Sequence, residues 1–205
     1  MPGKDVSVLR LKISLEHIDP TPWREIEIRA DRTLAHLHDA IQAAFLWYDL
    51  HLWQFEIGAR RYELKGQNQG VEPMFGPPVV DAVSKKLGFF LKPAVPPVIY
   101  TYDFGDDWRH RVVPVSTRQM APDEPLPGFL GGSWATPPED IGGPPGYDLF
   151  REARENESHP EHDWAREAGH VDWAHTEIHQ NAIIDAFAEL QKQKRRAPNP
   201  WMSEG

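Results

Sequence analysis

Residues 9–16 read Leu-Arg-Leu-Lys-Ile-Ser-Leu-Glu, so apolar and polar side chains alternate along the whole segment. A period of two over this length predicts a β-strand with one buried face. Residues 23–29 continue the pattern, with Ile26 and Ile28 on one face. Only a proline-containing turn at residues 18–22 separates the two segments. We therefore expect them to pair as a hairpin.

The period changes after residue 33. Apolar residues then recur at steps of three and four, which predicts an amphipathic helix that ends near Trp47 and that Thr33 or Asp31 could cap. Further strands are expected at residues 52–57 and 62–64. An antiparallel pair is expected at residues 98–103 and 108–115, around the turn residues Phe104, Gly105, Asp106 and Asp107.

The rest of the chain completes the expected fold. Residues 65–78 read as a loop, residues 79–87 as a short helix, and the proline-rich segment 121–146 as irregular. Helices are expected at 147–154, 160–168 and 176–195. The sequence thus predicts a single α+β domain over residues 1–196, with a mostly antiparallel sheet, a β-β-α-β start and a helical C-terminal third. We expect residues 197–205 to form a disordered tail.

Composition narrows the classes of function. The 205 residues carry 31 acidic and 22 basic side chains, and the resulting charge of −9 repels phosphate backbones. The absence of cysteine excludes disulfides, thiolate zinc sites and cysteine nucleophiles. The sequence does not begin with the apolar run of a signal peptide. It also contains no stretch that approaches the ~20 apolar residues of a membrane span. We expect a cytoplasmic protein whose partner is another protein or a small molecule, with neither membrane nor nucleic acid as partner.

Three stretches carry a family resemblance. They are Ile-Gln-Ala-Ala-Phe at 41–45 with His-Leu-Trp-Gln-Phe-Glu-Ile-Gly at 51–58, Tyr-Thr-Tyr-Asp-Phe-Gly-Asp-Asp-Trp-Arg-His at 100–110, and Pro-Pro-Glu-Asp-Ile-Gly-Gly-Pro-Pro-Gly-Tyr at 137–147. In this order they resemble the plasmid pRiA4b ORF-3-like family over roughly residues 6–190. The resemblance implies an α+β domain and an association with plasmids and mobile elements. The family is of unknown function, so it implies no chemistry.

The chain departs from that family at three positions. Many members have two cysteines where this sequence has Phe129 and Thr136, and a histidine often stands where it has Trp53. A metal or redox role for those cysteines therefore has no counterpart here.

The acidic hairpin and the proline-rich loop are the candidate site. Turn chemistry at Gly105 and Asp106, with Phe104 and Trp108 in the core, explains much of the hairpin. The functional interpretation is a binding surface shared by both segments. Its predicted residues are Tyr102, Asp103, Asp106, Asp107, Trp108, His110, Glu139 and Asp140.

Three functions fit this surface. The leading hypothesis is a non-catalytic binding module without a cofactor, because serine-hydrolase, phosphate-loop and dinucleotide motifs are absent. The alternative is a metal-assisted hydrolase, with a divalent metal held by Asp103, Asp106, Asp107, His110 and Glu139. The third is nucleic-acid stacking on Trp53, Tyr62 or Trp108 beside Arg60, Arg61 and Arg109, against which the net charge argues.

Two histidine pairs have the spacing of metal ligands on one helical face. They are His159 with His162 and His175 with His179. The surrounding segment is polar, so a solvated surface is the simpler interpretation. His159 and His162 remain secondary candidates for a metal.

Overall fold

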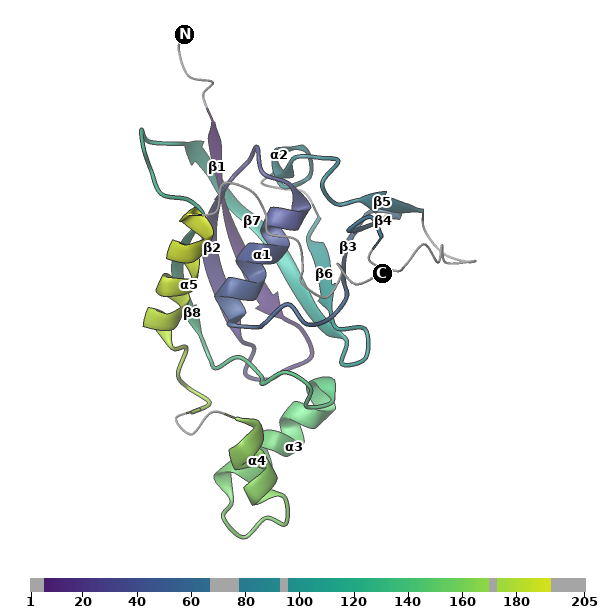
Figure 1. Cartoon of the computed structure of the whole chain (residues 1–205), viewed down its shortest axis with the longest axis vertical. Helices are drawn as coiled ribbons and strands as arrows, with labels where there is room; N and C mark the ends of the chain where they lie inside the picture. The colour runs from purple at the N-terminus through teal and green to yellow at the C-terminus, as the bar shows by residue number, and fades with distance from the viewer. Residues whose placement is uncertain (1–5, 67–77, 93–95, 170–172, 193–205) are drawn as a thin grey trace.

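The alternating N-terminal segments form β1 (Ser7–Leu15) and β2 (Trp23–Arg29), which pair as the predicted antiparallel hairpin. Their inward side chains, among them Leu9, Leu11, Ile13, Ile26 and Ile28, are buried. The structure, a computed structural model, describes residues 6–66, 78–92, 96–169 and 173–192 (Figure 1). The predicted tail at 197–205, and most of the predicted loop at 65–78, lie outside these residues.

In the described residues, eight strands form one sheet. The other strands are β3 (Trp53–Ile57), β4 (Arg60–Glu63), β5 (Val79–Asp81), β6 (Val98–Tyr102), β7 (Trp108–Gln119) and β8 (Gly128–Ser133). The order is β5-β4-β3-β6-β7-β1-β2-β8, and only the β4–β5 pair is parallel. The antiparallel pairing predicted around residues 104–107 is that of β6 with β7. The α+β class and the mostly antiparallel sheet are confirmed.

Five helices accompany the sheet in the described part of the chain. They are α1 (Leu34–Phe45), α2 (Leu87–Phe90), α3 (Gly143–Glu155), α4 (His162–Ala168) and α5 (Gln180–Lys192). The N-cap of α1 is Thr33, one of the two residues that were predicted to cap this helix. Helix α1 crosses one face of the sheet, α5 lies between it and β8, and α3 with α4 forms a pair beyond one end of the sheet (Figure 1). Among the described residues, none of the helices has both the length and the apolar composition of a membrane-spanning segment.

The prediction of a helix at residues 79–87 is wrong. Residues Val79–Asp81 instead form β5, whose backbone pairs with β4, and the helical turn begins only at Leu87. Ala82 N donates to Glu63 O at 2.8 Å, and Val83 N donates to the Asp81 carboxylate at 3.1 Å. Pairing with the edge of the sheet at β4 and the turn at Asp81 thus replace the predicted helix.

The prediction of no regular structure in residues 121–146 is also wrong in part. Strand β8 lies within it and pairs with β2, and α3 already begins at Gly143. Gly132 explains why a glycine-rich segment becomes a strand here. A Cβ at this position would lie 2.6 Å from Trp23 O and 2.8 Å from Arg24 Cδ. Glycine therefore lets the strand approach a large buried side chain.

The last helix begins later than predicted, at Gln180 instead of Thr176. Its buried residues are Ile183 and Phe187. Phe187 packs near Phe129 of β8, with 6.2 Å between ring centroids. The strand missed in the proline-rich segment is thus the surface on which α5 rests.

Candidate functional site

The two predicted loops meet in space. Asp106 Oδ2 accepts a hydrogen bond from Gly142 N at 3.2 Å. Gly143 packs so closely against the hairpin that a Cβ built on it would lie 2.2 Å from Asp106 O. Gly143 also has a φ of +69°, in the left-handed region. A glycine at this position therefore permits the contact between the turn after β6 and the start of α3.

Replacing Gly143 should separate the two loops. We expect Gly143→Ala to lower the free energy of unfolding by roughly 1–3 kcal/mol, from backbone strain and overlap with Asp106. Chemical denaturation would measure the change. Gly131→Ala is the matched control, since no atom lies within 4 Å of its Cβ position. Equal stability of the two variants would contradict a close contact at Gly143.

Several of the predicted site residues are core residues. Trp108 and His110 are 1% and 0% exposed, and they lie on the inward face of β7. His110 packs edge-on against Phe45 and Trp47. Neither side chain reaches solvent, so the five-residue ligand set expected for the hydrolase does not assemble. Phe104, expected in the core, is instead exposed, and so is Asp107.

The stacking platform expected for nucleic acid is also absent from the surface. Trp53, Tyr62 and Trp108 are at most 4% exposed. Trp53 is covered by His38, whose ring stacks on it at 4.2 Å. Bases cannot reach these faces, because all three rings are buried in the interior.

Tyr102 and Glu139 form the hydrogen-bonded centre between the loops. The Tyr102 hydroxyl donates to Glu139 Oε1 at 2.5 Å and accepts from Leu50 N at 2.9 Å. Glu139 Oε2 accepts from Tyr48 N at 3.2 Å. Burial raises the pKa of the Glu139 carboxyl, against the opposing effect of these hydrogen bonds. Burial also raises the pKa of Tyr102, and the neighbouring carboxylate adds to that shift.

A histidine and two aspartates gather beside this centre. His51 Nε2 lies 3.1 Å from Asp140 Oδ1, and His51 Nδ1 lies 3.7 Å from Asp103 Oδ2. Asp103 and Asp140 were both predicted, whereas His51 was not. The sheet register brings it there, since Asp103 N donates to Leu52 O at 2.9 Å and so extends the β3–β6 pairing beyond the strand ends. The pairing of these two strands is the signal that could have revealed His51.

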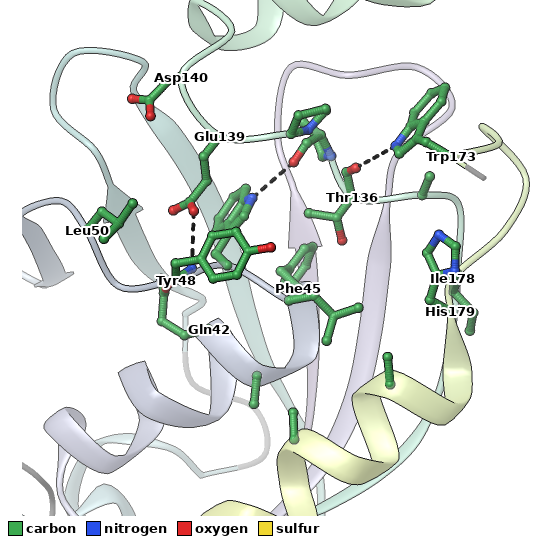
Figure 2. A pocket seen from close by; sticks show the side chains of 18 of the residues that line it. Gln42, Phe45, Tyr48, Leu50, Thr136, Glu139, Asp140, Trp173, Ile178 and His179 are labelled. Carbon is green, nitrogen blue, oxygen red and sulfur yellow. Dashed lines mark hydrogen bonds between the residues drawn. The ribbon is translucent and has the colours of Figure 1, made fainter. Parts of the chain in front are cut away.

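A pocket of about 730 Å³ opens next to Glu139 (Figure 2). Its walls come from the end of α1, from residues 135–140 and from the start of α5. Trp47 Nε1 donates to Pro137 O at 3.0 Å and Trp173 Nε1 donates to Thr136 O at 3.1 Å, so two indoles hold the loop that forms one wall. The pocket is mostly apolar and has two carboxylates, Glu139 and Asp140; the described residues that line it include no lysine or arginine.

The two ends of the pocket differ in character. Glu139 lies beside Tyr48 and Leu50 at one end, whereas Trp173, Ile178 and His179 lie at the other (Figure 2). Asp140 points away from the centre of the pocket (Figure 2). The pocket itself was not predicted, because it depends on how α5 and the 135–140 segment fold back on α1.

Neither histidine pair lies on one helical face. His159 precedes α4, and its Nδ1 accepts from Glu161 N at 3.0 Å. His162 Nδ1 lies 2.8 Å from Ala153 O. His175 and His179 both precede α5, and His175 stacks on Trp134. Among the described residues, none of these histidines belongs to a group of three metal-ligand side chains.

Comparison with known proteins places this architecture in a family. The sequence model of the plasmid pRiA4b ORF-3-like proteins matches residues 7–182, most of the chain. The chain belongs to the plasmid pRiA4b ORF-3-like family. The resemblance noted in the sequence is thereby confirmed.

Relatives of this pRiA4b ORF-3-like protein are themselves uncharacterised. The uncharacterized protein y4hQ of Sinorhizobium fredii is 31% identical over 188 residues, which cover 91% of this chain and 90% of the relative. A crystal structure of a protein of unknown function, MM3350 of Methanosarcina mazei, is similar with a TM-score of 0.75 and 28% identity. That similarity covers 85% of this chain and 96% of the other. The family is therefore one of unknown function, and the site geometry is the guide to its role.

Proposed function

We propose that this protein is a non-catalytic binding protein for a small organic cation with an apolar body. The observation that carries the proposal is the pocket, which joins an apolar interior to a partly buried carboxylate, Glu139. Pockets of this size hold small organic ligands, and a few placed polar groups orient them. The association with plasmid or mobile-element biology follows from the family name alone and stays a prediction.

Charge selects the class of ligand. Glu139 and Asp140 line the pocket, and none of the other wall residues that the structure describes is a lysine or arginine. An ammonium group at Glu139 would form a charge-assisted hydrogen bond, while an anionic ligand would meet repulsion. The apolar body of the ligand would extend toward Trp173 and Ile178 at the opposite end. Both Glu139 oxygens already accept one hydrogen bond each, so the carboxylate is oriented before a ligand arrives.

Calorimetric titration with three matched probes would test the proposal. Phenylbutylamine, phenylbutanol and phenylbutyrate share one apolar body and differ in the charge of the head group. We expect the amine to bind most tightly and with one site per chain. Its affinity should fall as the pH drops, because Glu139 becomes protonated at a higher pH than an ordinary glutamate. Equal or tighter binding of the carboxylate, or no binding of the amine, would refute the proposed class.

Two variants assign the binding to the pocket. Glu139→Gln should weaken the amine by about 10–100-fold, as expected for a lost hydrogen bond between charged groups, and should leave the alcohol almost unchanged. Ala182→Trp should abolish binding of all probes, because Ala182 lines the pocket while remaining exposed. Asn181→Trp is the matched control, since Asn181 is exposed and outside the pocket lining. Undiminished binding to the Ala182→Trp variant would place the ligand elsewhere.

A further inference from the structure

His51, Asp103 and Asp140 come from three separate segments. His51 precedes β3, Asp103 follows β6, and Asp140 lies in the loop before α3. Each offers one ligand atom, and these three atoms all lie within 4.8 Å of one another. Long-range pairing of the sheet and the contact of the two loops bring them together. Neither His51 nor Asp103 lines the pocket, whereas Asp140 belongs to both, so this cluster adjoins the proposed organic-cation site and differs from it in two of its three residues.

Hydrogen bonding does not explain the arrangement. His51 Nε2 is shielded from solvent and has no hydrogen-bond partner, although Asp140 Oδ1 lies 3.1 Å away. The 3.7 Å between His51 Nδ1 and Asp103 Oδ2 is too long for a hydrogen bond. The imidazole thus lies within ion-pair distance of two carboxylates, one at each ring nitrogen, without a hydrogen bond to either. A buried nitrogen left in this way calls for another partner.

Asp103 is fixed in place by the hairpin turn. Its Oδ1 accepts from Gly105 N at 2.9 Å, and its side chain is mostly buried. The other oxygen, Oδ2, is the one directed toward His51. The Asp140 carboxylate is largely exposed. The cluster therefore combines one anchored carboxylate with one that is free to adjust.

We propose that His51, Asp103 and Asp140 bind a first-row divalent cation, Zn²⁺ or Mn²⁺. One imidazole nitrogen with two carboxylate oxygens is a mixed ligand set. The imidazole favours Zn²⁺ over Mg²⁺ and Ca²⁺, while the carboxylates also suit Mn²⁺. Ligand atoms that share such an ion lie at most about 4.4 Å apart, since each bond is about 2.0–2.2 Å long. The three ligand atoms, all within 4.8 Å of one another, thus lie close to that limit, and the largely exposed Asp140 carboxylate is free to adjust.

Three protein ligands leave at least one position of the ion open to water or to an external donor. The ion would offset the negative charge that Asp103 and Asp140 concentrate at the meeting point of the two loops. It would also connect β3, β6 and the loop before α3 through one centre. Metal binding should therefore stabilise the fold as well as saturate at one ion per chain.

The test uses the full chain after chelator treatment and dialysis. Titration calorimetry with Zn²⁺ and Mn²⁺ is expected to show one site, with Zn²⁺ bound more tightly. Mn²⁺ binding would be followed independently as loss of the free-ion signal in electron paramagnetic resonance. Thermal unfolding should show a higher midpoint with Zn²⁺ than with chelator. The absence of saturable binding of both ions would overturn the proposal.

Variants assign the ion to these three residues. His51→Ala and Asp140→Asn should each weaken binding by more than the roughly 10–100-fold that loss of a supporting residue costs. Their unfolding midpoints with chelator should stay near that of the parent chain, which would show that both variants fold. The double variant His159→Ala/His162→Ala is the control and should bind the ion normally. Binding that survives His51→Ala, or that disappears in the control, would assign the ion to a different site.

Discussion

Replacement of Arg24 by alanine should lower the free energy of unfolding by about 3–5 kcal/mol. Arg24 is 1% exposed, and its guanidinium donates only to uncharged oxygens. These are Ala44 O at 2.9 Å, Trp23 O at 2.8 Å, Ser133 O at 3.0 Å and Thr136 Oγ1 at 3.0 Å. In the described part of the chain no carboxylate forms an ion pair with it. Alanine would remove a donor from each of these buried or partly buried acceptors.

Burial is the physical reason that Arg24 stands apart from surface arginines. Removal from water lowers the pKa of its guanidinium to about 10. The same side chain links the end of α1, β2, β8 and the loop that walls the pocket. Urea unfolding of Arg24→Ala beside Arg111→Ala would measure its contribution. Arg111 is half exposed and pairs with Glu16 at 2.6 Å, so its loss should cost about 1 kcal/mol or less. Similar losses for the two variants would contradict the predicted role of Arg24.

Acidification should destabilise the fold through His110. Burial among aromatic side chains lowers the pKa of its imidazole to about 3, and the contact of Nδ1 with Trp108 O at 3.0 Å opposes this shift only in part. An unfolded histidine has a pKa near 6.5. Below that pH the unfolded chain binds a proton that the folded chain takes up only near pH 3. Stability from this residue is therefore full above pH 6.5 and is lost as the pH falls toward 3.

The expected size of this effect is about 2 kcal/mol between pH 7 and pH 5, from about 1.4 kcal/mol for each pH unit below 6.5. The stability difference between the parent chain and a His110→Gln variant should shrink by that amount over this range. His17→Asn is the control, since His17 is exposed and asparagine tolerates its left-handed φ of 65°. A difference that stays constant with pH would show that His110 does not titrate as described.

Local periodicity predicted the elements whose burial is one-sided. Buried residues such as Leu11 and Ile28 follow the period of two in β1 and β2. Leu37 follows the three- and four-residue spacing in α1. The same period of two places Trp108 and His110 on the face of β7 that also carries Val112. Their assignment to a binding surface followed from residue type, and strand alternation was the stronger signal.

The remaining features depend on contacts distant in sequence. Gly132 favours a loop when considered alone, yet it becomes part of a strand because Arg24 lies beneath it. His51 becomes a candidate metal ligand only because β3 pairs with β6 and because Asp140, which is distant in the sequence, lies beside it. The pocket likewise needs α1, the 135–140 segment and α5 together. No window of local sequence contains such partners.

The close approach of Gly132 to Arg24 has an evolutionary consequence. A side chain at position 132 would overlap Arg24 Cδ, and a smaller residue at position 24 would remove a donor from the acceptors around it. A paired change would not restore the packing, because a Cβ at position 132 would still lie 2.6 Å from Trp23 O whatever residue replaced Arg24. Across relatives that keep this strand pairing, position 132 should therefore remain glycine even where position 24 varies. The contact between Gly132 and the backbone of Trp23 would then preserve the register between β2 and β8 during evolution, even where the residues that line the pocket change.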